Sequence, residues 1–117
     1  MQTVIITGGT KGIGADIASK FLKEGWQVMI AARNKSGLST ENHYNLRFQA
    51  MDVRKEKEHY ALVQKTLEWT GTLDCFINCA GYSERSPVES VNDEFWVKMI
   101  DTNLKGAFWG CKTATAN

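Results

Sequence analysis

A cluster of glycines near the N-terminus has the spacing of a nucleotide phosphate cradle. Residues 7–14 read TGGTKGIG, directly after an apolar β-branched run and directly before an amphipathic stretch. Gly8 allows a tight turn, while Gly12 and Gly14 permit close approach of the backbone to a pyrophosphate and of a helix to a strand. A helix that begins here presents N–H groups and a positive dipole end to phosphates. This context favours a dinucleotide site over the alternative, a strand-to-helix turn without a ligand.

Two basic side chains near this turn bear on which dinucleotide would bind. Residues 31–34 read AARN, at the end of a second apolar run. A carboxylate here would accept hydrogen bonds from ribose hydroxyls and repel a 2′-phosphate, but the sequence has Ala32 and then Arg33. Arg33 can pair with that phosphate and stack on adenine, and Lys11 supplies a second cation. The alternative is that both are solvated surface charges.

Strand and helix patterns alternate along the chain and must position these residues. Apolar runs predict strands over residues 3–7, 26–32, 46–53 and 73–78. Apolar residues at helical spacing predict helices over residues 12–24 and 55–69, and two more that begin near Asn92 and near Asn103. The polar segment 34–45 has room for only a short helix.

This alternation predicts an α/β fold, a doubly wound parallel sheet of the Rossmann type with local strand order 3-2-1-4. A ligand is expected where the strand order reverses, beyond the carboxyl ends of the first and fourth strands. The glycine turn and residues 78–81 (NCAG) both fall there. Two separate sequence features therefore indicate one crevice.

Four short patterns together resemble the short-chain dehydrogenase/reductase family. Residues 7–14 resemble its T-G-x-x-x-G-x-G turn, and residues 78–81 resemble its N-N-A-G after the fourth strand. Residues 52–53 (DV) resemble its Asp-Val after the third strand, and residues 103–106 (NLKG) resemble its N-x-x-G. The resemblance spans essentially the whole chain but only the N-terminal half of the family's usual domain. Cys79 stands where the family more often has asparagine, a change we expect to be tolerated because backbone atoms carry much of this contact.

The resemblance implies roles for individual residues. Asp52 would accept a hydrogen bond from the adenine amino group, with Val53 beside the ring; alternatively, Asp52 caps the helix expected to begin near Lys55. Asn103 would belong to an Asn-Ser-Tyr-Lys catalytic set, kinking its helix and holding a water that links to the catalytic lysine. Asn103 can also be read as a helix N-cap.

The turn after the fourth strand has an implied role as well. Ala80 and Gly81 would keep side chains away from the cofactor ribose, and Asn78 can tie strand backbones together. An ordinary strand-to-loop turn is compatible with both roles.

The family's proton donor, a tyrosine followed four residues later by a lysine, is missing. The residue four positions on is Phe48 after Tyr44, Gln64 after Tyr60 and Ser86 after Tyr82. We therefore expect residues 1–117 to be the N-terminal part of a single NAD(P)-binding Rossmann domain. The catalytic half, with its Ser, Tyr and Lys, would lie outside this chain. Alone, the chain would be inactive and prone to aggregate.

The expected function is that of an NADP(H)-dependent oxidoreductase that transfers hydride between nicotinamide and a carbonyl or alcohol substrate, with NAD(H) as the alternative cofactor. A non-catalytic dinucleotide-binding sensor or scaffold is the alternative function. The expected partners are the small-molecule substrate, the missing half, and further copies in a homodimer or homotetramer. The candidate cofactor-binding residues are Gly8, Thr10, Lys11, Gly12, Ile13, Gly14, Arg33, Asn34, Asp52, Val53, Asn78, Cys79, Ala80 and Gly81, and the candidate catalytic residue is Asn103.

Composition narrows the other classes of function. The 117 residues carry a net charge of +1, which favours neither nucleic acid nor an anionic membrane as a partner. The sequence has no apolar run of bilayer length and no signal-like start, so we expect a soluble, cytoplasmic protein. Its three cysteines do not suggest a metal site, and we read Cys75 and Cys111 as small core residues. His43 and His59 stand among polar residues and receive no role.

Overall fold

The computed structural model describes residues 1–35 and 43–116. Its elements follow in the order β1 (Thr3–Thr7), α1 (Gly12–Lys23), β2 (Gln27–Ala32), β3 (Leu46–Ala50), α2 (Glu56–Thr70), β4 (Cys75–Asn78), η1 (Val88–Ser90), α3 (Asp93–Ile100), η2 (Asp101–Lys105) and α4 (Gly106–Thr115). The short helix for which segment 34–45 has room lies largely outside the described residues.

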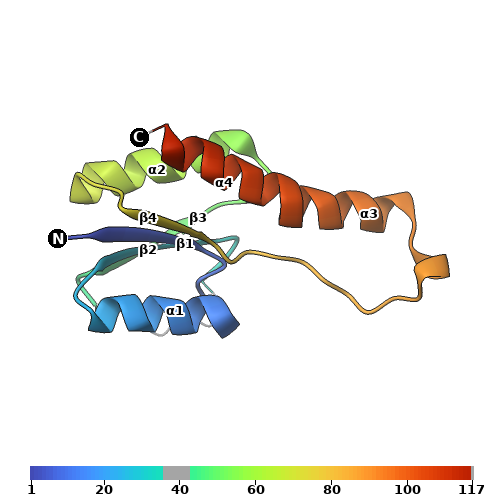
Figure 1. Cartoon of the computed structure of the whole chain (residues 1–117), viewed down its shortest axis with the longest axis horizontal. Helices are drawn as coiled ribbons and strands as arrows, with labels where there is room; N and C mark the ends of the chain where they lie inside the picture. The colour runs from blue at the N-terminus through green and yellow to red at the C-terminus, as the bar shows by residue number, and fades with distance from the viewer. Residues whose placement is uncertain (36–42, 117) are drawn as a thin grey trace.

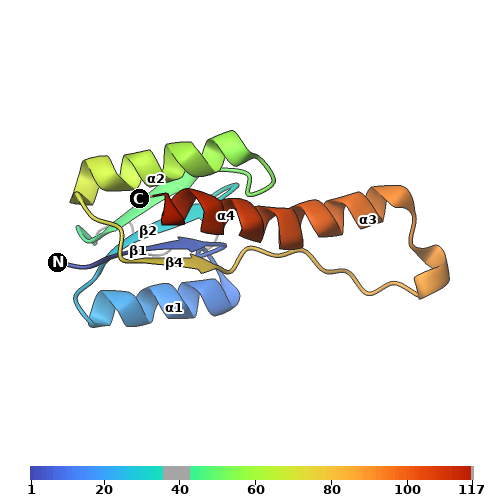
Figure 2. The same cartoon turned by 45° about the horizontal axis from the view of Figure 1, so that its top comes forward.

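The strands form one parallel sheet in the order β3-β2-β1-β4, which confirms the predicted fold class and strand order. Helix α1 covers one face of this sheet, and α2 and α4 cover the other (Figures 1 and 2). Covered on both faces, β1 is buried along its whole length, which explains its continuous β-branched run. The register places Thr7, at the end of β1, opposite Ala31 and Asn78. The glycine turn, the residues after β2 and the turn at residues 78–81 therefore lie together at the carboxyl ends of the strands.

The core consists of two apolar layers, one on each face. Successive strand residues point to opposite faces, so Val4 and Ile6 pack with Ala18 of α1. Ile5 of the same strand packs with Leu62 of α2. The sheet is thus packed between helices on both faces, and the loops that follow the strands start from ordered residues at its carboxyl edge.

The predicted third and fourth strands extend too far. β3 ends at Ala50 rather than at residue 53, because the chain turns there: Lys55 N–H donates to the Asp52 carbonyl at 3.1 Å. β4 begins at Cys75 rather than at residue 73. Just before it, the Asp74 side chain accepts a hydrogen bond from Thr3 N–H at 2.8 Å. A backbone turn marks the end of β3 and a side-chain contact precedes the start of β4, and hydrophobic patterning reveals neither.

One long helical segment replaces the two helices expected to begin near Asn92 and Asn103. α3, η2 and α4 follow one another without a break (Figure 1). Within this segment, η2 is a π-helical turn. Asn92 does cap α3, since its side chain accepts from Phe95 N–H at 2.9 Å. Asn103 lies inside the π turn, so the reading of Asn103 as a helix N-cap is wrong. In such a turn the backbone hydrogen bonds join residues five apart instead of four. Single π turns of this kind are frequent at functional sites.

Two residue expectations are also corrected. Cys111 is exposed rather than a core residue, and Cys75 is only partly buried on β4. His59, expected in polar surroundings, is fully buried on the face of α2 that packs on the sheet.

Candidate cofactor-binding site

A cavity of about 290 Å³ opens at the carboxyl edge of the sheet. Its walls come from the loops after β1, β2 and β4, and the lining residues are Gly8, Thr10, Lys11, Ala32, Arg33, Asn34, Cys79, Ala80 and Gly81. A smaller cavity of about 70 Å³ shares Gly8, Ala32, Arg33 and Ala80 with it and adds Met51, Asp52, Val53, Arg54 and Thr102. Because the two cavities share walls, we describe them together as the groove.

The glycine turn and the turn after β4 touch directly at Gly8. Gly8 has a φ of +70°, and a Cβ there would lie 2.8 Å from both the Cα and the N of Ala80. Its N–H donates to the Ala31 carbonyl at 2.8 Å. Only glycine satisfies both the left-handed φ and this close contact, so the structure brings the two sequence motifs together here.

The other two motif glycines do different work at the start of α1. A Cβ on Gly14 would collide with the Gly8 carbonyl oxygen, so this glycine lets the helix pack on the turn. Gly12 has a φ of +60°, and a Cβ there would meet nothing within 4 Å. Lys11 provides no side-chain cap, and the first turn has no acidic residue. The open backbone beside an uncapped helix start can hold an anionic pyrophosphate. Ile13, beside it, is 75% exposed.

Thr7 holds the turn after β4 and was not among the predicted site residues. Its hydroxyl accepts from the N–H groups of Cys79 and Ala80, each at 3.3 Å, and lies 3.5 Å from the Ile77 carbonyl. Cys79 is therefore bound through its backbone, which is compatible with a cysteine at this position. The threonine that opens the glycine motif was the available sequence signal.

Cations line the groove on the side of β2 and α1. Lys11 and Arg33 are exposed and line the main cavity, and Arg33 also lines the smaller one. Asn34 lies beside them. The structure thus brings together the two basic residues that the sequence suggested for a ribose phosphate.

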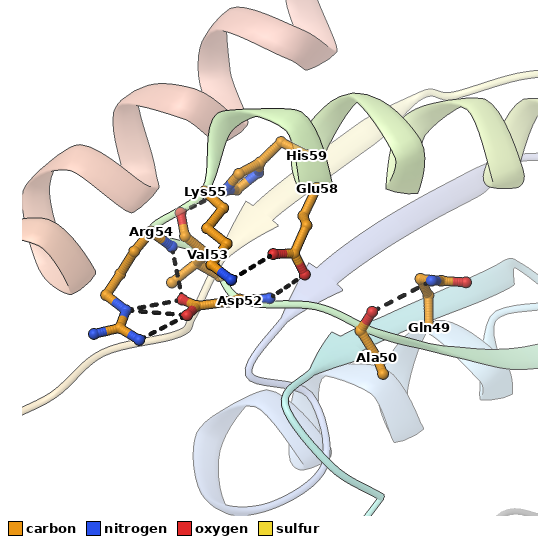
Figure 3. Close-up of polar contacts among 8 residues, drawn as sticks. All are labelled: Gln49, Ala50, Asp52, Val53, Arg54, Lys55, Glu58 and His59. Atoms are coloured by element: carbon orange, nitrogen blue, oxygen red, sulfur yellow. Dashed lines mark hydrogen bonds and ion pairs between the residues drawn. The ribbon is translucent and has the colours of Figure 1, made fainter.

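The Asp52 carboxylate is held by one neighbour, Arg54 (Figure 3). Arg54 donates to it from its backbone N–H at 3.0 Å, from Nε at 3.0 and 3.2 Å and from Nη2 at 2.7 Å. These hydrogen bonds lower the pKa of Asp52 from 3.8 to about 2, against the opposing effect of its burial. Asp52 does not cap α2, whose N-cap position is Lys55, so that alternative is wrong.

Five predicted residues are not among those that line the groove: Gly12, Ile13 and Gly14 at the start of α1, and Asn78 and Asn103. Asn103 binds the loop after β4: its Oδ1 accepts from Tyr82 N–H and its Nδ2 donates to the Tyr82 carbonyl, both at 2.7 Å. Asn78 faces α4, where its Nδ2 lies 3.7 Å from Cys111 Sγ. Its carboxamide oxygen also leaves no room for a Cβ on Gly110. The catalytic role of Asn103 and the cofactor-binding role of Asn78 remain predictions.

The sequence resemblance now has independent support. The family model described as short chain dehydrogenase matches residues 2–117. The chain belongs to the short-chain dehydrogenase family. Among the residues that the structure describes, no helix combines the length and apolar character needed to cross a membrane.

Individual proteins are also similar to this chain. An uncharacterized oxidoreductase of Staphylococcus haemolyticus is 37% identical over 112 residues, covering 92% of this chain and 48% of its own length. An NADP-dependent (R)-specific alcohol dehydrogenase of Lentilactobacillus kefiri is 34% identical, covering 95% of this chain and 46% of its own. The crystal structure of an actinorhodin polyketide ketoreductase variant with NADPH has a TM-score of 0.88 and 34% identity, covering 97% of this chain and 46% of that one. The chain thus spans about half the length of the relatives it matches.

Proposed function

We propose that this chain forms the NADP(H)-binding part of an oxidoreductase that transfers hydride between nicotinamide and a carbonyl or alcohol substrate. The observation that carries the proposal is the groove itself. It lies at the start of α1 beside a glycine turn with open backbone, and Lys11 and Arg33 line it. A related alcohol dehydrogenase described as NADP-dependent and a related ketoreductase structure with NADPH support the choice of cofactor.

In this proposal, different residues in and beside the groove bind different parts of the cofactor. The turn at Gly12 holds the pyrophosphate, while Lys11 and Arg33 pair with the 2′-phosphate. Asp52 and Val53 border the adenine, and the turn at residues 79–81 borders the nicotinamide ribose. Bound there, the nicotinamide ring supplies or accepts the hydride.

Asn103 is the residue of this chain that we propose to contribute to the reaction beyond cofactor binding. Its amide fixes the loop after β4 at Tyr82, and the π turn around it alters the local backbone hydrogen bonds. None of the tyrosines in the sequence is followed four residues later by a lysine. We therefore propose that residues 1–117 bind the cofactor without completing the reaction, and that the proton donor comes from a C-terminal segment of the same Rossmann domain.

The cofactor preference is tested by Arg33→Asp in the purified protein. Removing the cation and adding a carboxylate beside the 2′-phosphate is expected to weaken NADPH binding by about 1.5–3 kcal/mol, while NADH binding changes little. Binding is measured by titration with each dinucleotide. Lys23→Asp makes the same charge change in the last turn of α1, away from the groove. Equal weakening by both variants, or an unchanged ratio of NADPH to NADH affinity, would refute the proposal.

The cytoplasmic location and the homodimer or homotetramer remain predictions. All three cysteines are free, which fits a reducing compartment.

A further inference from the structure

His59 is the most deeply buried polar ring in the described part of the chain. It lies in the first turn of α2 and has no exposed surface. Its Nε2 is 2.7 Å from the Val53 carbonyl oxygen (Figure 3). Its ring centroid lies 6.3 Å from that of Phe76. Nδ1 is buried and has no hydrogen-bond partner among the described residues. Buried polar atoms are usually hydrogen-bonded, so a buried histidine that uses only one of its two ring nitrogens needs an explanation.

The geometry identifies the protonation state of the ring. A carbonyl oxygen can only accept, so Nε2 must carry the proton. Protonating Nδ1 as well would place a charged N–H in the core with nothing to accept it. Burial accordingly lowers the pKa of His59, although the Val53 carbonyl and the nearby Glu58 and Asp52 carboxylates favour the charged form. The native ring is therefore neutral and donates from Nε2.

The residue whose carbonyl binds His59 lines the groove. Val53 and Asp52 both line its smaller cavity. Helix α2 holds these neighbouring residues at two points, because Glu58 Oε1 also accepts from Asp52 N–H at 3.1 Å (Figure 3). On the other side is Gly106, where a Cβ would lie 3.0 Å from Val53 Cγ2 and 3.2 Å from the Val53 carbonyl. The turn is therefore clamped between α2 and α4.

We propose that His59 is a positioning residue for the adenine end of the groove, fixing the Val53 peptide through its neutral imidazole and thereby the placement of Asp52 and Val53. This rests on the proposed function, since it concerns the same dinucleotide site. An apolar side chain at position 59 would leave the partly buried Val53 carbonyl without its donor. The turn would then shift, although no residue that lines the groove had been changed.

The test uses half-ligands in the purified protein. Adenosine 2′,5′-bisphosphate probes the adenine end, and reduced nicotinamide mononucleotide probes the other end. His59→Leu is expected to weaken binding of the bisphosphate and of NADPH by about tenfold, the scale of one buried hydrogen bond, and to leave mononucleotide binding unchanged. His59→Gln can donate from its amide at the place of Nε2 and is expected to restore wild-type affinity.

Thr66→Val is the matched control. Thr66 is also fully buried on α2, but its hydroxyl donates to the Leu62 carbonyl within the helix. It should lower stability without changing the affinity for either half-ligand. Equal weakening of both half-ligands by His59→Leu, an effect of Thr66→Val on bisphosphate binding, or failure of His59→Gln to restore affinity would overturn the inference.

A spectroscopic measurement on the unmutated protein does not depend on any variant folding. Nitrogen-15 shifts of the His59 ring at pH 7.5 are expected to show the neutral form protonated at Nε2, and a proton on Nδ1 would overturn the inference. If the unmutated protein binds neither NADPH nor the bisphosphate, the proposed function fails and this inference fails with it. If it binds both and His59→Leu binds them equally well, only the inference fails.

Discussion

At the residue scale, the turn after β3 shows how the Asp52 carboxylate is kept charged at the wall of the groove. Arg54 surrounds the Asp52 side chain with three donor groups, and Glu58 binds the N–H of the same residue. Charge-assisted hydrogen bonds of this kind give both orientation and strength. The carboxylate is therefore held as an acceptor by the fold itself, before any ligand arrives.

Arg54→Met tests this arrangement. Without the guanidinium, the pKa of Asp52 is expected to rise from about 2 toward 3.8. Because this pair is partly solvent-exposed, the loss of stability at pH 7 should be only about 1 kcal/mol. In the unmutated protein this contribution is present above pH 3.8 and is lost as the pH falls toward 2. A carbon-13 titration of the Asp52 carboxyl and urea unfolding at pH 7 measure the two effects. An unshifted titration in the variant would contradict the account.

The burial of His59 predicts a pH dependence of stability. Its folded-state pKa lies below the 6.5 of the unfolded chain. Above pH 6.5 both states are neutral, and the native state keeps its full stability. As the pH falls below 6.5, the unfolded chain takes up the proton first, so stability declines until the folded-state pKa is reached.

Urea unfolding across this pH range should therefore show a smaller decline in His59→Gln than in the unmutated protein. His43, the other histidine in the sequence, is exposed. His43→Gln is expected to show the same decline in stability as the unmutated protein. If the decline disappears in His43→Gln, it does not come from His59 and the prediction is wrong.

At the element scale, the turn between β1 and α1 contains glycines for two different reasons. Gly14 avoids a steric clash, and Gly12 avoids the strain of a positive φ. Gly14→Ala would drive a Cβ into the Gly8 carbonyl, and a backbone atom cannot move aside as a side chain can. We expect a loss of about 3 kcal/mol, at the upper end for overpacking. Gly12→Ala meets no atom and suffers only from its positive φ, which costs about 1 kcal/mol. Denaturant unfolding of both variants should give this order, and equal losses would be inconsistent with the packing of α1 on the turn.

The same scale shows what could be predicted from the sequence and why. β1, β2, α1 and the glycine turn were predictable because their patterns are local: a β-branched run, helical spacing and glycines at fixed intervals. Composition did not predict the π turn, because residues 103–106 have the polar and glycine composition of a helix start; only the family resemblance implied a kinked helix at Asn103. His59 had a signal that was overlooked: it shares helical spacing with Leu62, Val63 and Thr66, all of them buried. Its contact with Val53 depended on where β3 ends, which apolar runs do not mark.

At the scale of the whole molecule, the layers protect the sheet unequally. β1 is enclosed by strands and helices, while β4 has a strand partner on one side only among the described residues. The long segment from α3 to α4 carries large apolar side chains in solvent, with Trp96, Leu104 and Phe108 each at least 60% exposed. Unpaired strand edges and contiguous apolar surface favour association. In the described part of the chain, the free edge of β4 and the apolar side chains of the α3–α4 segment therefore form a surface on which another protein segment can pack.

This surface predicts how residues 1–117 behave when produced alone. We expect self-association that increases with concentration, seen as light scattering and as a broad, irreversible melt. Replacing Trp96, Leu104 and Phe108 together by glutamine should reduce the scattering, because their side chains lie in solvent and contribute little to the two core layers. Gln substitutions at exposed Lys57, Lys65 and Glu68 of α2 form the control and should leave scattering unchanged. A sharp, cooperative melt of an unaltered monomer would refute the prediction, because it would mean that the two core layers suffice without cover for α3, α4 and the β4 edge.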